Sequence, residues 1–109
     1  MAADDIGIHG TVCGAGAAAR AVELTAEVRE VRVVNSHATQ YAMVSVAEGS
    51  WAANAATVAV VGADELVMVP PASSKVVWRN PKVKKLVNLS IIASGATTPC
   101  YVEGSLWLT

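Results

Sequence analysis

Two cysteines and two histidines are the residues of this chain that could act as nucleophile and base. They are Cys13, Cys100, His9 and His37. A thiol becomes a nucleophile beside a base such as imidazole, and a zinc site needs several such ligands at short, regular spacings. The two histidines stand far apart in the chain, and neither forms such a ligand pattern with its neighbours. We therefore predict no catalytic residues, no metal site and no cofactor, so the chain is not expected to be an enzyme.

A glycine-rich segment, Gly14–Ala19, matches the G-x-G-x-x-A form of a dinucleotide-binding loop. That loop must open a helix and be followed, about 20 residues on, by an acidic residue at the end of the next strand. Here the next strand-like run, Val31–Val34, ends in Asn35, and the chain lacks alternating helices. The segment is therefore expected to be a loop of small residues between two strands.

Basic residues gather in one place, where Lys82, Lys84 and Lys85 follow Arg79 and Trp78. A nucleic-acid site would stack a base on the tryptophan and hold phosphates with the lysines. The chain has a formal net charge of -1, so it lacks the long-range field of a nucleic-acid or anionic-membrane binder. Such a cluster more often forms a solvated edge that prevents unwanted strand pairing. If it has a function, we expect docking to an acidic protein surface.

Trp51 stands between the turn-like Glu48-Gly49-Ser50 and the alanine-rich stretch 52–56. Its neighbours are too small to cover an indole, and exposed aromatic side chains often anchor protein interfaces. The expected interface residues are therefore Trp51, Lys82, Lys84 and Lys85.

The elements that position these residues are predicted to be strands. Of the 109 residues, 18 are Val, 4 Ile and 7 Thr, and such β-branched side chains suit pleated strands. Apolar and polar residues alternate strictly over 22–29, and the phase then resets at Arg29–Glu30, which indicates a turn or bulge. Other strand-like runs are 6–12, 31–34, 41–46, 57–61, 65–69, 75–79, 84–92 and the closing 100–102 and 105–108.

Eight or nine short strands at regular spacing predict an all-β antiparallel sandwich, either a jelly roll or an Ig-like fold. The gaps are too short to hold the helices of a parallel sheet. We expect one domain, with an N-terminal strand and an extended Gly/Ala-rich arm at 1–19 and the β-sandwich at 20–109. The arm is expected to reach onto a neighbouring subunit.

Composition limits the classes of function. The chain is 53% hydrophobic and 16% charged, which excludes ordinary disorder. Its longest uncharged stretch, Leu86–Val102, holds too many polar residues to cross a bilayer, and the acidic start does not predict a cleaved signal. A reducing compartment then favours buried thiols over a Cys13–Cys100 disulfide, and that pairing stays open. Weakly polar outer strand faces predict contacts with other subunits.

Several strand patterns together resemble small all-β virion proteins of tailed bacteriophages. They lie at 21–25, 31–35 (Val-Arg-Val-Val-Asn), 42–46, 66–71 (ending Pro70-Pro71) and 89–95, so the similarity spans roughly residues 20 to 104. The resemblance implies a capsid decoration (cement) protein that binds the head shell, with no catalytic residues.

Under that interpretation the partners are copies of the chain itself, as a dimer or trimer, and a major capsid protein or other virion subunit, and the location is the virion. The alternatives are a head-tail or tail accessory subunit, or an Ig-like or carbohydrate-binding recognition module that uses Trp51 and Tyr41.

Overall fold

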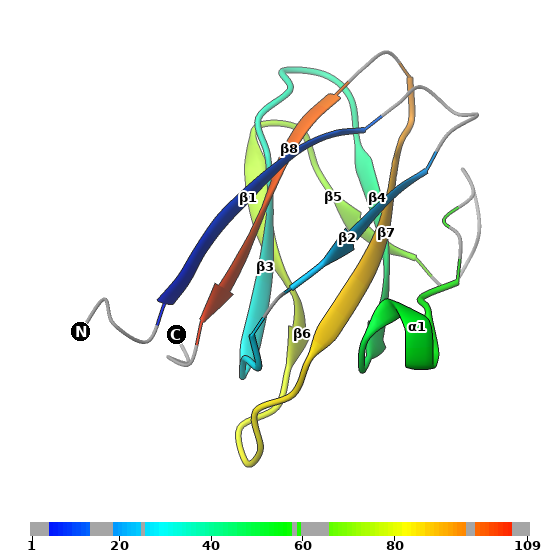
Figure 1. Ribbon diagram of the computed structural model, residues 1–109. Helices are drawn as coiled ribbons and strands as arrows, with labels where there is room; N and C mark the ends of the chain where they lie inside the picture. The colour runs from blue at the N-terminus through cyan, green and yellow to red at the C-terminus, as the bar shows by residue number, and fades with distance from the viewer. Residues whose placement is uncertain are drawn as a thin grey trace.

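The computed structural model describes residues 5–13, 19–24, 26–57, 59, 66–95 and 98–105, with the backbone alone for 5–13. These residues form eight strands and one short helix (Figure 1). The strands are β1 (Asp5–Cys13), β2 (Arg20–Glu23), β3 (Glu30–Asn35), β4 (Ala42–Glu48), β5 (Val67–Val69), β6 (Ser73–Arg79), β7 (Val87–Ala93) and β8 (Thr98–Ser105), and the helix is α1 (Trp51–Asn54). Within the described residues no helix is long and apolar enough to span a membrane.

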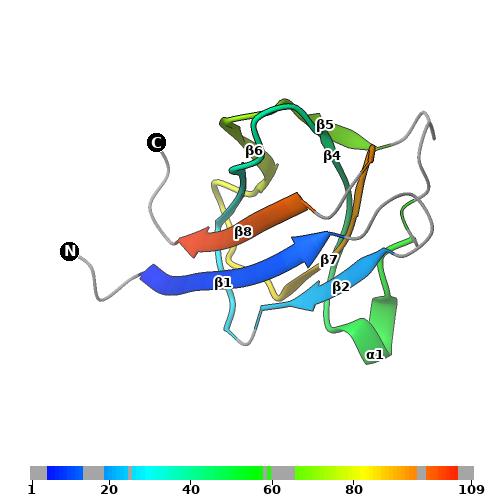
Figure 2. The same cartoon turned by 90° about the horizontal axis from the view of Figure 1, so that it is seen from above.

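The strands form two four-stranded antiparallel sheets that face each other. One has the order β1-β8-β3-β6 and the other β2-β7-β4-β5 (Figures 1 and 2). The first strand pairs with the eighth, the second with the seventh, the third with the sixth and the fourth with the fifth. This nested pairing is that of a hairpin folded double, the jelly roll. The antiparallel sandwich is therefore confirmed, and the order of pairing decides against the Ig-like alternative.

Alternating side chains of both sheets fill the space between them. In β8 every second residue from Thr98 to Gly104 is buried, which is the period of a strand with one face inward. The core is aliphatic, and each fully buried Val, Leu or Ile contributes about 1.5–3 kcal/mol. Its buried members are Val22, Leu24, Val28, Val31, Val33, Ala42, Val44, Val69, Val87, Leu89, Ile91, Ala93, Cys100 and Val102. Cys100 is thus a buried thiol; the side chain of Cys13 lies outside the described residues.

Strand β7 is buried on both of its faces. Val87, Leu89 and Ile91 belong to the core between the sheets. On the outer face, Ile92 packs with Met43 and Ala59 in a second apolar cluster. The chain that follows α1 therefore covers the outside of this sheet.

Two expected strands differ from those observed. The run predicted at 22–29 is divided, because β2 ends at Glu23 and the chain meets the sheet again only at an isolated bridge between Val28 and Lys85. The run predicted at 57–61 is not a strand at Thr57 or Ala59, and the remainder lies outside the described residues. The Ala59 N–H donates to the Ser90 side chain (3.0 Å), so its hydrogen bond goes to a side chain and not to a strand ladder.

Near the C-terminus one strand replaces two. β8 continues through Glu103 and Gly104, where the sequence predicted a break, because both residues pair with β3 at Arg32 and Val31. Residues 106–108 lie outside the described part. The strand predicted at 84–92 corresponds to β7, which begins at Val87 and not at Lys84.

The N-terminal strand predicted at 6–12 is confirmed as β1, an edge strand that pairs with β8 from Asp5–Ser105 to Cys13–Thr98. Residues 5–13 of the expected arm therefore belong to the sandwich of their own chain, and the segment 14–18 lies outside the described residues.

Candidate functional site

Three of the four residues expected at an interface lie in the connection between β6 and β7, residues 80–86, here called the lysine loop. The Asn80 side chain starts the loop by accepting hydrogen bonds from the N–H groups of Lys82 (3.0 Å) and Val83 (3.1 Å). The backbones of Lys85 and Val28 exchange two hydrogen bonds of 2.8 Å at its other end. At its start the Asn80 N–H also donates to the Arg29 carbonyl (2.8 Å), so both ends of the loop are fixed to the sandwich.

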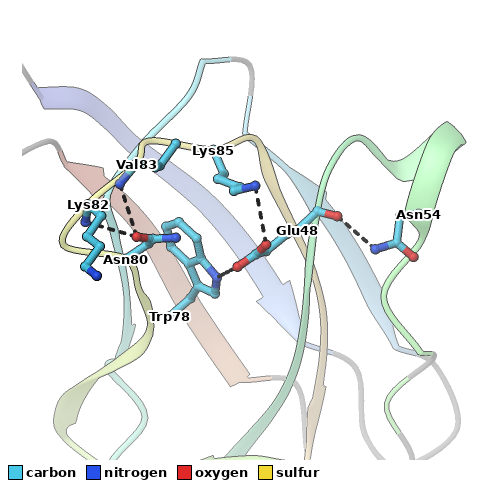
Figure 3. A network of polar contacts seen from close by, with 7 residues as sticks. All are labelled: Glu48, Asn54, Trp78, Asn80, Lys82, Val83 and Lys85. Carbon is cyan, nitrogen blue, oxygen red and sulfur yellow. Dashed lines mark hydrogen bonds and ion pairs between the residues drawn. The ribbon is translucent and has the colours of Figure 1, made fainter.

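Glu48, the last residue of β4, joins the lysine loop to the rest of this end (Figure 3). Its carboxylate accepts a hydrogen bond from the Trp78 indole N–H (3.1 Å) and lies 4.0 Å from the Lys85 ammonium. Since both partners of the ion pair are nearly half exposed, the pair itself contributes at most about 1 kcal/mol. The Glu48 carboxylate mainly fixes positions, because it holds the Trp78 indole and the Lys85 ammonium next to each other.

Trp78 is half-buried and packs against the core. With its N–H on Glu48, the ring is fixed at the base of the lysine loop. The tryptophan that a nucleic-acid site would use for stacking is therefore a packing residue beside an acidic group.

The tip of the loop carries the exposed charge. Lys82 and Lys84 are exposed, and neither makes a salt bridge within the part of the chain that the structure describes. Val83 lies between them with 52% of its surface exposed. Two cations flanking an apolar side chain suit a protein surface that offers carboxylates around an apolar spot.

Beside the loop is an open groove of about 450 Å³. Its lining combines Lys84 and Lys85 with the carboxylates of Glu27 and Glu48, together with Gly49, Val83 and Leu86. Gly49 has φ 111°, a conformation that side-chain-bearing residues rarely adopt, and its N–H donates to the Leu86 carbonyl (2.6 Å). The turn after β4 is therefore bound closely to the lysine loop.

Trp51, the fourth expected interface residue, was predicted to be an exposed aromatic in a turn. In the structure it is half-buried and begins α1, which Ser50 caps by accepting a hydrogen bond from the Ala53 N–H (3.2 Å). The Trp51 N–H donates to the Glu23 carboxylate of β2 (2.6 Å). Trp51 itself does not line the groove of the lysine loop, although Glu48 and Gly49, just before it in the chain, do.

His37 and Cys100, the described members of the nucleophile and base set, have structural surroundings. Nδ1 of His37 accepts hydrogen bonds from the N–H groups of Thr39 (3.0 Å) and Gln40 (3.1 Å), which closes the turn between β3 and β4. Cys100 lies in the core. In the described residues no group of three His, Cys, Asp or Glu side chains is close enough to hold a metal ion.

A second hollow, of about 500 Å³, lies over the outer face of the β1-β8-β3-β6 sheet. Arg32 and Glu103 face each other there in register across β3 and β8. The lining includes Ala72, a non-glycine residue with φ 51°, in the turn before β6. The full lining is Arg32, Val34, Asn35, Ser36, Ala72, Ser73, Ser74 and Glu103.

Sequence reasoning missed Glu27 and Glu48, the acidic side of the groove. They are single carboxylates in separate parts of the chain, and each has the pattern of an ordinary solvated charge. The sequence held one indication of the position of Glu48: the residue precedes a glycine turn, which predicts that a strand ends at this point.

No protein-family model matches the chain, and no curated protein matches it. Among solved structures, the crystal structure of PirA is similar, with a TM-score of 0.51 over 90% of this chain and 92% of that one. The sequence identity is 13%, so the similarity concerns the fold alone. The similarity extends over nearly the full length of both chains.

Proposed function

We propose that the chain is a non-catalytic structural protein of a bacteriophage virion, a capsid decoration protein that binds the head shell and stabilises it. Its partners are a major capsid protein and copies of itself. Three features support the proposal: the resemblance of the strand patterns, the jelly-roll topology, which viral capsid domains use, and a low charge content.

The observation that carries the proposal is the lysine loop. It is a fixed projection with two exposed cations at its tip, and its fixed ends lower the entropy lost when it docks. Charges at such a rim mainly set orientation and association rate, while apolar contacts beside them supply affinity. Docking on an acidic patch of a shell subunit uses both Val83 and the lysines. A tail subunit with the same acidic chemistry is the alternative partner.

The test uses tailed-phage particles induced from the cells that encode the chain and purified on a density gradient. The chain should band with intact particles and, after heads and tails are separated, with the heads. Recombinant chain should also rebind heads from which it has been stripped and raise their resistance to heat. Absence from purified particles would overturn the proposal, and its presence on separated tails alone would favour the tail alternative.

The hollow beside Arg32 and Glu103 favours a second candidate function, recognition of a carbohydrate. It combines charged and hydroxyl side chains, and Tyr101 is exposed one residue further along β8 from Cys100 and opposite Val34. Sugars are bound through hydrogen bonds together with an aromatic face. Two results together would support carbohydrate recognition instead of decoration. The chain would bind to a glycan array and lose that binding in Tyr101→Ala, and it would be absent from purified particles.

A further inference from the structure

The turn between β3 and β4, residues 36–41, is closed by a side chain that can take up a proton. Nδ1 of His37 accepts hydrogen bonds from the N–H groups of Thr39 (3.0 Å) and Gln40 (3.1 Å). Asn and Asp commonly close turns in this way, with a side-chain oxygen that accepts from the backbone N–H groups that follow. Here the acceptor is an imidazole nitrogen, which becomes a donor when it is protonated.

Gln40 connects this turn to β3 and to the turn after β7. Its backbone carbonyl accepts a hydrogen bond from the Asn35 side chain (2.7 Å), and its side-chain oxygen accepts one from the Ser94 hydroxyl (3.1 Å). The Gln40 side chain also lies directly against Gly95, where a Cβ would meet it. Because His37 holds the Gln40 N–H, its ring positions the residue on which these contacts depend.

The surroundings of His37 offer no ion pair to a protonated ring. His37 is half-buried, and no carboxylate forms a salt bridge with it among the residues that the structure describes. Glu103, the nearest carboxylate on the strands that meet this turn, lies opposite Arg32 in register. The titratable or charged side chains on the turn and on the nearby parts of the strands are Arg20 of β2, Arg32 of β3, Tyr41, Lys75 of β6, and Tyr101 and Glu103 of β8. A proton on Nδ1 therefore costs two hydrogen bonds and gains no salt bridge.

We propose that His37 makes the turn between β3 and β4 sensitive to acid. The neutral ring closes the turn when its proton is on Nε2, because Nδ1 is then the acceptor. A proton on Nδ1 turns this acceptor into a donor that faces two other donors, so the turn and the proton compete for one lone pair. Protonation opens the turn and loosens the contacts of Gln40 with Asn35 and Ser94. This inference goes beyond the proposed function and does not depend on it.

NMR spectroscopy of the full chain tests the proposal. While the ring is neutral, its nitrogen resonances should show the tautomer protonated on Nε2. As the pH is lowered, the Cε1 resonance of His37 reports proton uptake, and the Thr39 and Gln40 amide protons should move upfield with it. The protection of the Gln40 amide from hydrogen exchange, corrected for the intrinsic dependence on pH, should fall about threefold or more, as the loss of one hydrogen bond implies.

His37→Asn is the matched control. The Oδ1 of asparagine is bonded to Cγ, as Nδ1 of histidine is, so it accepts the same two hydrogen bonds but does not titrate. The Thr39 and Gln40 amides of this variant should stay unchanged over the same pH range. Any shift that remains in it belongs to other groups, such as His9. His37→Gln moves the oxygen one carbon further out and should leave the turn open at every pH.

Three results would overturn the proposal. They are a neutral His37 ring protonated on Nδ1, amides of Thr39 and Gln40 that do not move while the ring titrates, and shifts of the same size in His37→Asn. The wild-type titration alone gives the first two results, so the test does not depend on the folding of a variant.

Discussion

Asn35 connects the turn that follows β3 with the turn at Pro70, which lies 35 residues further along the chain. Its side-chain NH2 donates to the carbonyls of Gln40, Val69 and Pro70, and its side-chain oxygen accepts a hydrogen bond from the His37 N–H (3.0 Å). The residue is 1% exposed, so water cannot replace a partner that its side chain loses, and its contact with the Val69 carbonyl is buried as well. Asn35 therefore fastens the end of β3 to the turn after β5.

Asn35→Ala should lower the free energy of unfolding by about 2–3 kcal/mol, because it leaves buried backbone groups unpaired. Urea unfolding followed by tryptophan fluorescence measures the loss. Ser36→Ala is the control, since this neighbouring exposed side chain makes one hydrogen bond, to the Pro99 carbonyl (3.1 Å), and should cost about 1 kcal/mol or less. Equal losses in the two variants would contradict the role given to Asn35.

At the scale of elements, β7 organises the sheet that it centres. Its polar residues Asn88 and Ser90 are buried, where a strand facing water on one side would expose them. Asn88 accepts a hydrogen bond from the Ala56 N–H (2.7 Å) and donates to the carbonyls of Gly49 (2.8 Å) and Asn54 (3.0 Å). One side chain thus holds the turn after β4, the end of α1 and the segment that follows it.

Asn88→Ala should release this segment while the sheet stays paired. Amide hydrogen exchange measures it residue by residue, and we expect the Ala56 amide to exchange at least tenfold faster, as losing a buried hydrogen bond of about 1.5 kcal/mol implies. Ser90→Ala should accelerate the Ala59 amide and leave Ala56 nearly unchanged. If the Val44 amide of β4 accelerates as much as Ala56 in Asn88→Ala, the effect is global and the local role of Asn88 is wrong.

At the scale of the whole molecule, the lysine loop lies at one end of the sandwich together with the carboxylates of Glu27 and Glu48 (Figure 1). If this end docks on a shell subunit, as the proposed function requires, salt should weaken the contact, because screening weakens interactions between exposed charges.

Lys82→Glu and Lys84→Glu should each weaken binding to stripped heads by about three- to tenfold, an electrostatic effect of about 1 kcal/mol. Co-sedimentation at low and high salt measures it, and wild-type binding should also weaken as salt rises. Lys75→Glu changes the net charge equally on exposed β6 and should bind as wild type does. If Lys75→Glu weakens head binding as strongly, net charge and not the lysine loop governs docking.

Much of the strand content could be predicted locally. The alternation of β3 and β7 identified the strands and their faces, because side chains point to opposite faces at a period of two. The same rule failed at 22–29, where alternation continues past the end of β2. β2 ends at Glu23 because its antiparallel partner, β7, extends only as far as Val87 in that direction. The alternation within one strand carries no information about the length of its partner. The interface lysines were found as a cluster, whereas their acidic neighbours come from other parts of the chain.

By itself the sequence determined that the chain is rich in strands and poor in charge, and it located the lysine cluster. Only the tertiary structure decided which strands pair and which carboxylates lie beside the lysines. A jelly roll pairs β1 with β8 and β2 with β7, so the contacts that define it join residues up to 100 positions apart. Such pairing depends on how two sheets bury their inner faces together, which no local pattern encodes. Glu48 lies beside the lysine loop because β4 pairs with β7, which places Glu48 opposite Val87.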